Sequence, residues 1–106
     1  MTPAARVQSA IELLDAILIS ARDGGAAADV VATRFFKERR YAGSKDRRAI
    51  RDLAWHAIRS FGDKPHSGRA ALLTLAADDA ELAALFTGDE RAPAVINTGE
   101  PHASRI

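Results

Sequence analysis

The sequence predicts an all-α protein, a bundle of about five helices followed by an extended C-terminal tail. Three observations favour this fold class: alanine is abundant, valine occurs at only four positions, and apolar residues recur at spacings of three and four. A chain of 106 residues suits a single domain with a modest core. We assign residues 1–88 to the helical domain and residues 89–106 to a tail or linker.

The first predicted helix runs from about Pro3 to Ala21 and ends at a pair of glycines. Thr2 is its expected N-cap, and Pro3 occupies the first helical position, where its missing N–H costs nothing. Ile19 lies off the apolar stripe and is a candidate for a second contact. The stripe itself is formed by residues at helical spacing, namely Val7, Ala10, Ile11, Leu14, Ile17 and Leu18.

The second predicted helix runs from about Ala26 to Arg39. Phe36 lies at the edge of its apolar face, and the Tyr-Ala-Gly segment at residues 41–43 ends the periodic pattern. The face that we expect to be buried contains Ala28, Val31, Ala32 and Phe35.

The third predicted helix runs from about Lys45 to Ser60, with Ser44 as its N-cap and Asp46 in its first turn. At about 100° per residue, Trp55 projects away from the apolar face toward the basic side of the helix. Trp55 either stacks on an unpaired RNA base or is covered by a neighbouring helix, and we favour the second interpretation. The apolar face contains Ile50, Leu53, Ala54, Ala57, Ile58 and Phe61.

Two short helices are expected in the C-terminal half, after a turn rich in Gly, Asp and Pro. Ser67 would cap a helix over residues 68–76, and Asp78 or Asp79 would cap a helix over residues 80–86. From Thr87 onward the sequence has no periodicity, so we expect a tail that contacts the domain locally through Val95 and Ile96. The expected apolar residues of the two helices are Leu72, Leu73, Leu75, Leu82, Leu85 and Phe86.

Composition excludes or disfavours several classes of protein. The chain has no cysteine, which rules out disulfides, thiolate metal sites and cysteine nucleophiles and fits a reducing compartment. No apolar run approaches the roughly 20 residues that a membrane-spanning helix needs. The N-terminal residues resemble neither a signal peptide nor a transit peptide. We therefore expect a cytoplasmic protein with no membrane partner.

The cations of the chain are concentrated in residues 34–59. This segment carries nine cations against three anions, whereas the net charge of the whole chain is only +1. Segregated positive charge interleaved with aromatic side chains is typical of a polyanion-binding surface, and arginine suits bidentate contacts to phosphate. The alternative is an ordinary solvated helix surface, but the density of the run favours RNA or another polyanion. The nine cations are Arg34, Lys37, Arg39, Arg40, Lys45, Arg47, Arg48, Arg51 and Arg59.

Five of these cations flank the predicted turn between the second and third helices. Arg39 and Arg40 end the second helix, where a cation interacts favourably with the helix dipole by about 0.3–1 kcal/mol. Lys45, Arg47 and Arg48 begin the third helix, where this interaction has the opposite sign. A bound anion explains these three cations better than the isolated fold does, because a helix N-terminus also offers free N–H groups to phosphate.

No catalytic or metal-binding constellation can be assembled from the residues. The histidines at positions 56, 66 and 102 lack the converging ligands that a zinc site needs. The Gly-Ser-Lys segment at residues 43–45 resembles the end of a phosphate loop but lacks the upstream glycine and the preceding strand. The acids at positions 78, 79 and 81 are explained as helix caps and first-turn acids. We expect a chain with no metal, no cofactor and no catalytic activity of its own.

Two segments together resemble the NusB-like domain. They are ARVQSAIELLDAIL at residues 5–18 and GSKDRRAIRDLAWHAIR at residues 43–59. The similarity is greatest to the amino-terminal NusB-like domain of bacterial RsmB (Sun, Fmu) type 16S ribosomal RNA cytosine-5 methyltransferases, and it covers about residues 4–95. The positions that match the family pattern are Arg6, Ala10 and Leu14, followed by Asp46, Arg47, Leu53, Ile58 and Arg59.

This resemblance implies a NusB-like bundle that binds RNA and directs a methyltransferase to 16S ribosomal RNA. The catalytic domain would act in cis if the natural protein is longer, since this chain has no Gly-rich S-adenosylmethionine loop. A protein–protein interaction module and a free-standing transcription antitermination factor are the alternatives. The chain departs from the family at Trp55-His56, where the family has a Tyr-Gly pair.

The resemblance also adds one arginine to the candidate site. Arg6 matches the opening arginine of the family and would extend the RNA surface, although it could instead pair with Glu12 or Asp15. The residues expected to bind RNA are Arg6, Arg34, Arg39, Arg40, Lys45, Arg47, Arg48 and Arg51.

Overall fold

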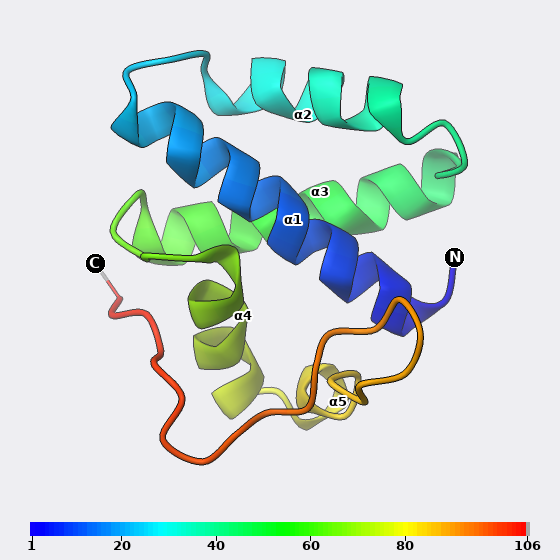
Figure 1. Cartoon of the computed structure of the whole chain (residues 1–106), viewed down its shortest axis with the longest axis vertical. Helices are drawn as coiled ribbons and strands as arrows, with labels where there is room; N and C mark the ends of the chain where they lie inside the picture. Colours follow the sequence, from blue (N-terminus) through cyan, green and yellow to red (C-terminus); the bar gives the residue numbers. More distant parts are fainter. Residues whose placement is uncertain (106) are drawn as a thin grey trace.

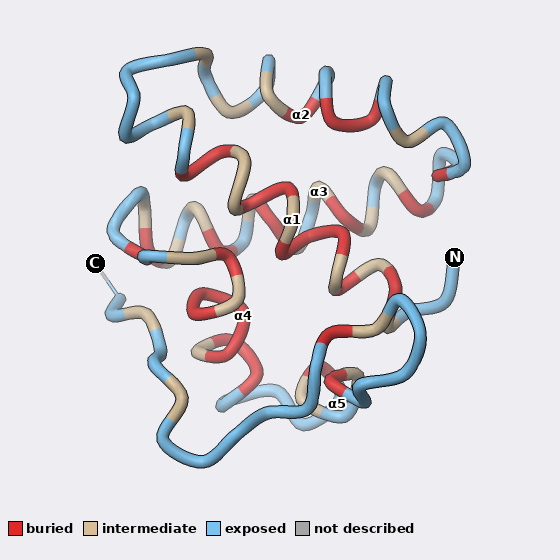
Figure 2. Tube along the Cα trace, viewed as in Figure 1, coloured by how far each residue is buried: buried red, intermediate tan, exposed pale blue. Residues whose placement is uncertain are grey.

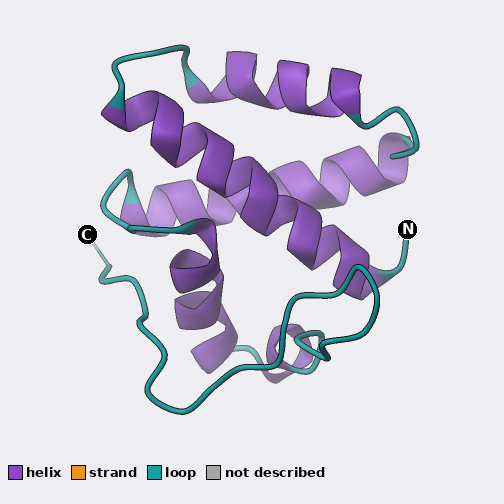
Figure 3. Ribbon diagram, viewed as in Figure 1, coloured by secondary structure: helices purple, strands orange, loops and turns teal. Residues whose placement is uncertain are grey.

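The computed structural model describes residues 1–105 as five α-helices joined by loops, with no strand in that range (Figure 3). The all-α prediction is therefore confirmed. In chain order the helices are α1 (Pro3–Arg22), α2 (Ala28–Glu38), α3 (Ser44–Phe61), α4 (Gly68–Ala77) and α5 (Ala80–Ala83).

The longest helix, α1, is the centre of the fold. It lies diagonally across α3 and contacts α2, α3 and α4 (Figure 1). The molecule measures 34 × 31 × 18 Å, and its shortest axis accommodates about two layers of helices, each about 10 Å across. Both α2 and α3 therefore keep a long outer surface in contact with solvent.

The core lies between the inner faces of α1, α2, α3 and α4, as the burial pattern in Figure 2 shows. The apolar stripe predicted for α1 is buried along its whole length, which confirms that prediction. Ile19, which lies off the stripe, is 56% exposed. The largest fully buried side chains come from every part of the chain and are Leu13, Ile50, Phe61, Leu72, Leu73 and Pro93.

Three of the predicted helix caps are confirmed. The side chain of Thr2 accepts a hydrogen bond from the Ala5 amide at 3.0 Å, and Ser67 and Asp79 cap α4 and α5 in the same way. The cap predicted for α3 is wrong, because Ser44 is already its first helical residue and Gly43 is the cap. Gly43 has no side chain that could accept from the helix amides, and Asp46 at N3 supplies the other half of a capping box, since its carboxylate accepts from the Gly43 amide at 3.1 Å.

The C-terminal part differs from expectation in two respects. Helix α5 ends at Ala83 rather than at residue 86, although Phe86 is buried as predicted. The tail contacts the domain, but the side chains of Val95 and Ile96 are 56% and 37% exposed, and Val95 contacts α4 only through its carbonyl, which accepts from Arg69 Nη2 at 3.1 Å. Pro93 is buried instead, where the extended segment passes the N-terminal end of α1 before it continues along α4 (Figure 1).

Polar contacts attach the last part of the tail to α4. The guanidinium of Arg69 forms an ion pair with Glu100, and its Nη2 donates to Glu100 Oε2 at 3.1 Å. Further along, the Ala103 amide donates to Thr74 Oγ1 at 2.9 Å, and Thr74 donates to the Ala103 carbonyl. Residues 100–103 therefore contact α4 through hydrogen bonds and an ion pair, and the Ala103 side chain also packs against the core.

Lowering the pH is expected to release the tail from α4. The Arg69 guanidinium, followed by the Asn97 amide, lowers the pKa of Glu100 from 4.5 to about 2. A carboxyl whose pKa is depressed by folding stabilises the folded form above its unfolded pKa, and this contribution is lost as the pH falls from 4.5 through about 2. The NMR signal of the Ala103 amide should move toward its unfolded position over this window.

The Glu100→Gln variant is the control, because it preserves the shape of the side chain and removes its titration. Its Ala103 signal should be displaced at neutral pH and should not change further between pH 4.5 and about 2. The same pH dependence in both proteins would contradict the assignment of the transition to Glu100.

Candidate functional site

A groove between the outer surfaces of α2 and α3 gathers four cations over an aromatic floor. Its volume is about 390 Å³. No carboxylate lines it, and none of its four cations forms an ion pair with a carboxylate of residues 1–105. The basic groove, as we call it, is lined by Thr33, Phe36, Lys37, Arg40, Arg47 and Arg51.

Helical spacing explains how these side chains reach one groove. Thr33 and Lys37 lie one turn apart on α2, and Arg47 and Arg51 lie one turn apart on α3. Arg40 lies in the short loop that joins the two helices, two residues after α2 ends (Figure 1). Helix α2 and the loop therefore contribute one cation each to the groove, and α3 contributes two.

Contacts with the protein orient the α3 side of the groove. The guanidinium carbon of Arg47 lies 5.9 Å from the ring centroid of Phe36, and its Nε donates to the Ala42 carbonyl at 2.9 Å. The guanidinium of Arg51 lies 4.9 Å from the ring centroid of Trp55. Both arginines are half-buried, whereas Lys37 and Arg40 on the opposite side are exposed.

Trp55 is half-buried and packs against the hydrophobic core. Its ring therefore contacts the core and is approached by Arg51, which agrees with the structural interpretation favoured from the sequence. Lys45 and Arg48, also expected in the site, are exposed near the start of α3 but do not line the basic groove.

Arg39 is adjacent to Arg40 in sequence but contacts a different part of the fold. Its guanidinium lies 3.6 Å from the centroid of the Phe35 ring and 3.6 Å from a carboxylate oxygen of Glu12 on α1. Together with Arg34 it lines a second groove, between α1 and α2. The predicted corner of five cations is therefore not one site, because Arg40 and Arg47 line the basic groove, Arg39 lines the other groove, and the remaining two line neither.

Arg6 pairs with Asp46 rather than with the sequence-proposed partners Glu12 or Asp15. Its Nε donates to Asp46 Oδ1 at 2.8 Å and so joins the start of α1 to the start of α3. This hydrogen bond, with smaller contributions from the Gly43 amide and nearby positive charge, holds the pKa of Asp46 below its ordinary value. Arg6 therefore has a structural role in the fold.

Three lining residues of the basic groove were not among the predicted site residues: Thr33, Phe36 and Lys37. A sequence signal linked two of them, because Thr33 and Lys37 are four residues apart and so lie on one face of the second helix. Phe36 could not be assigned from spacing alone. It is buried, but its ring is also the floor of the groove, and only the position of α3 creates that floor.

Other kinds of site are not apparent in the described part of the chain. Within residues 1–105 no three metal-ligating side chains converge, and no helix is both long and apolar enough to cross a membrane. Comparisons with protein-family models, with curated proteins and with solved structures returned no match for this chain. The geometry of the groove is therefore the main guide to function.

Proposed function

We propose that this chain is an RNA-binding, NusB-like domain that positions a bacterial 16S ribosomal RNA cytosine-5 methyltransferase on its substrate. The catalytic domain, supplied in cis by a longer protein, would bind S-adenosylmethionine and carry out the methyl transfer. The chain itself would hold the RNA backbone. The resemblance at residues 5–18 and 43–59 supports the family, and the basic groove supports the ligand.

The observation that carries the RNA proposal is the absence of carboxylates among the lining residues of the basic groove. Several cations elsewhere are paired with carboxylates, as Arg39 is with Glu12 and Arg105 is with Asp78. Four cations placed close together repel one another, and this repulsion is unfavourable for the isolated fold. A polyanion that fills the groove removes this repulsion and gains charge-assisted hydrogen bonds from the guanidinium groups.

The mechanism that follows is phosphate neutralisation. Arg47 and Arg51 are held in place by their contacts with Ala42 and Trp55, so they lose little side-chain freedom when a phosphate binds. Lys37 and Arg40 are exposed and can adjust to the path of the backbone. Contacts of this kind position a nucleic acid without reading its bases, so the groove by itself should show little sequence preference.

The salt dependence of RNA binding tests this proposal. Neutralising about four phosphates of a single strand predicts a slope of about −2.8 for the logarithm of the binding constant against the logarithm of salt concentration. Affinity for a 16S ribosomal RNA fragment should then fall about 50-fold between about 50 and 200 mM salt. Absence of binding at low salt, with the helical spectrum intact, would refute RNA binding by this chain.

A specific observation also supports a second candidate function, docking of a protein partner as an interaction module or antitermination factor. Ile19 is 56% exposed and lines the groove between α1 and α2 together with Val31 and Arg34. The Ile19→Asp variant separates the two functions. It should leave RNA affinity unchanged if the basic groove is the binding surface, and it should abolish partner binding if the α1–α2 groove is.

A further inference from the structure

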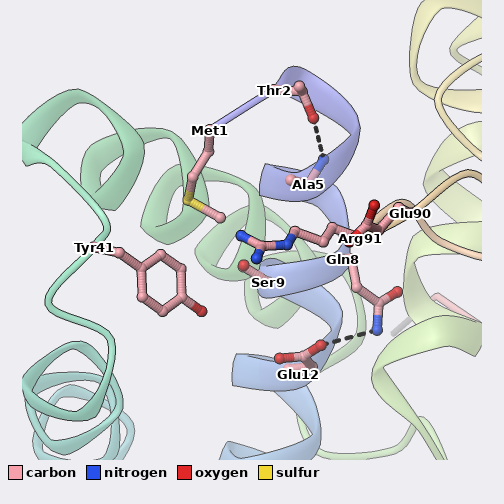
Figure 4. A pocket seen from close by; sticks show the side chains of 9 residues that line it. All are labelled: Met1, Thr2, Ala5, Gln8, Ser9, Glu12, Tyr41, Glu90 and Arg91. Carbon is pink, nitrogen blue, oxygen red and sulfur yellow. Dashed lines mark hydrogen bonds between the residues drawn. The ribbon is translucent and has the colours of Figure 1, made fainter.

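A second cavity lies beside the basic groove and has no role in the function proposed above. Its volume is about 600 Å³, within the range of small-molecule sites. Three separate segments build it: α1, the loop between α2 and α3, and the tail (Figure 4). Because Arg40 lines the basic groove and the next residue, Tyr41, lines the cavity, the two sites are adjacent.

The wall formed by α1 carries polar groups that a ligand can reach. No fully enclosed side-chain polar atom in the described range lacks a hydrogen-bond partner, so the Ser9 hydroxyl, which lines the cavity and forms no side-chain hydrogen bond, is open to the cavity. The neighbouring Gln8 donates from Nε2 to Glu12 Oε2 at 3.1 Å, which leaves the Gln8 carbonyl oxygen free to accept.

The opposite walls supply an aromatic ring, a cation and, beside that cation, the carboxylate of Glu90. Tyr41 is 65% exposed, and Figure 4 shows its ring facing α1 across the cavity with its hydroxyl directed inward. Arg91 extends from the tail into the same space (Figure 4) and forms no ion pair within residues 1–105.

Arg91 is also the one residue other than glycine in the described range that has a positive φ, 66°. Such a conformation is uncommon for a residue with a side chain, and it tends to occur at binding sites, where the strain is offset by the function of the side chain. The unusual backbone places a free guanidinium in a cavity that also contains an exposed aromatic ring.

We propose that this cavity receives one unpaired nucleotide of the RNA that occupies the basic groove, an inference that rests on the proposed function. The base stacks on Tyr41, the Arg91 guanidinium binds the phosphate, and Gln8, Ser9 and Glu12 contact the edge of the base. The Glu12 carboxylate accepts hydrogen bonds and cannot donate them, so it favours bases with an exocyclic amine over uracil. The cavity would thus provide the base selectivity that the groove lacks.

The test titrates the isotope-labelled full chain with cytidine monophosphate, uridine monophosphate and ribose 5-phosphate while backbone amide signals are followed by NMR. Cytidine monophosphate should shift the signals of Gln8, Ser9 and Arg91 and should bind more tightly than uridine monophosphate. Tyr41→Ala should weaken its binding about 5- to 150-fold, which corresponds to the loss of one base–aromatic stack. Tyr41→Phe should retain it, because the ring is preserved.

RNA binding measured in parallel separates the two proposals. If all three compounds shift the same signals with equal affinity, the nucleotide cavity is refuted while RNA binding through the basic groove is unaffected. If cytidine monophosphate binds as expected but the chain binds no RNA, the RNA occupant is refuted and a free nucleotide is the ligand. Because Tyr41 is largely exposed, its substitution should not disturb folding, and an unchanged helical spectrum verifies this.

Discussion

The double variant Lys37→Glu/Arg40→Glu is expected to bind 16S ribosomal RNA about 100-fold more weakly than the natural sequence at about 0.1 M salt. Each lost phosphate contact to a single strand lowers affinity about 5-fold at this salt concentration, which gives about 25-fold for two contacts. The two introduced carboxylates then repel the backbone and weaken binding further. The slope of affinity against salt should also become shallower by about 1.4.

These two residues are the most informative in the basic groove because their substitution removes charge without removing structure. Both are exposed, and neither forms an ion pair within residues 1–105. Charge reversal of Arg47 is less informative, since its Nε donates to the Ala42 carbonyl and its loss would alter the loop between α2 and α3. Fluorescence anisotropy with labelled RNA measures the affinities, and circular dichroism confirms that both proteins are helical.

The matched control is Arg22→Glu/Lys64→Glu, which changes the net charge by the same amount outside the groove. Both residues are exposed, and the substitution of Arg22 removes a single hydrogen bond, which its Nη2 donates to the Pro65 carbonyl. Its RNA affinity should remain within a few-fold of the natural sequence. Equal losses in both double variants would mean that total charge, rather than the basic groove, determines binding.

The largest expected effect on stability comes from Gly68→Ala, which should destabilise the protein by about 3 kcal/mol. Gly68 is the first residue of α4 and lies directly against α1. A Cβ atom at this position would collide with the Ile11 carbonyl oxygen and would lie 2.9 Å from Leu14 Cβ. The first of these atoms belongs to the backbone of α1, and the second is the first side-chain carbon of Leu14. Neither can move without shifting α1.

Two opposing effects determine the sign of this prediction. Alanine is a better helix former than glycine by up to about 1 kcal/mol, which favours the substitution. Separating α4 from α1 costs more, because it also stretches the 2.7 Å hydrogen bond that the Gly68 amide donates to Asp15. A loss of about 3 kcal/mol would lower the melting temperature by roughly 10–20 °C, as measured by thermal circular dichroism.

Gly43→Ala is the control for this substitution. Gly43 has an ordinary φ of −73°, and the nearest atom to an added Cβ is Asp46 Oδ2 at 3.7 Å, which is a normal contact. The cost should stay within about 1 kcal/mol, reflecting the preference against alanine at an N-cap. A similar melting temperature for both variants would show that α4 does not need the close approach to α1.

Local features of the fold were predictable because they depend on neighbouring residues. Hydroxyl and carboxylate caps at Thr2, Ser67 and Asp79 act within three residues of their partners, and the apolar stripe of α1 is a matter of helical spacing. The cap of α3 was misassigned by one residue, because the helix already begins at Ser44 and the Gly43 amide donates to the Asp46 carboxylate at the third helical position. Both Gly43 and Ser44 are residue types that occur as helix caps, so the sequence was compatible with either.

By itself, the sequence determined the all-α class, most helix boundaries and the concentration of positive charge in residues 34–59, because these follow from composition and short-range periodicity. Only the tertiary structure decided which cations share a surface. Arg39 and Arg40 both follow the end of α2 at Glu38, where the backbone leaves the helical conformation, and Arg39 pairs with Glu12 on α1 while Arg40 lines the basic groove with residues of α3. Similarly, the bonds of Arg6 to Asp46 and of the tail to α4 join residues far apart in sequence, and no local pattern specifies such partners.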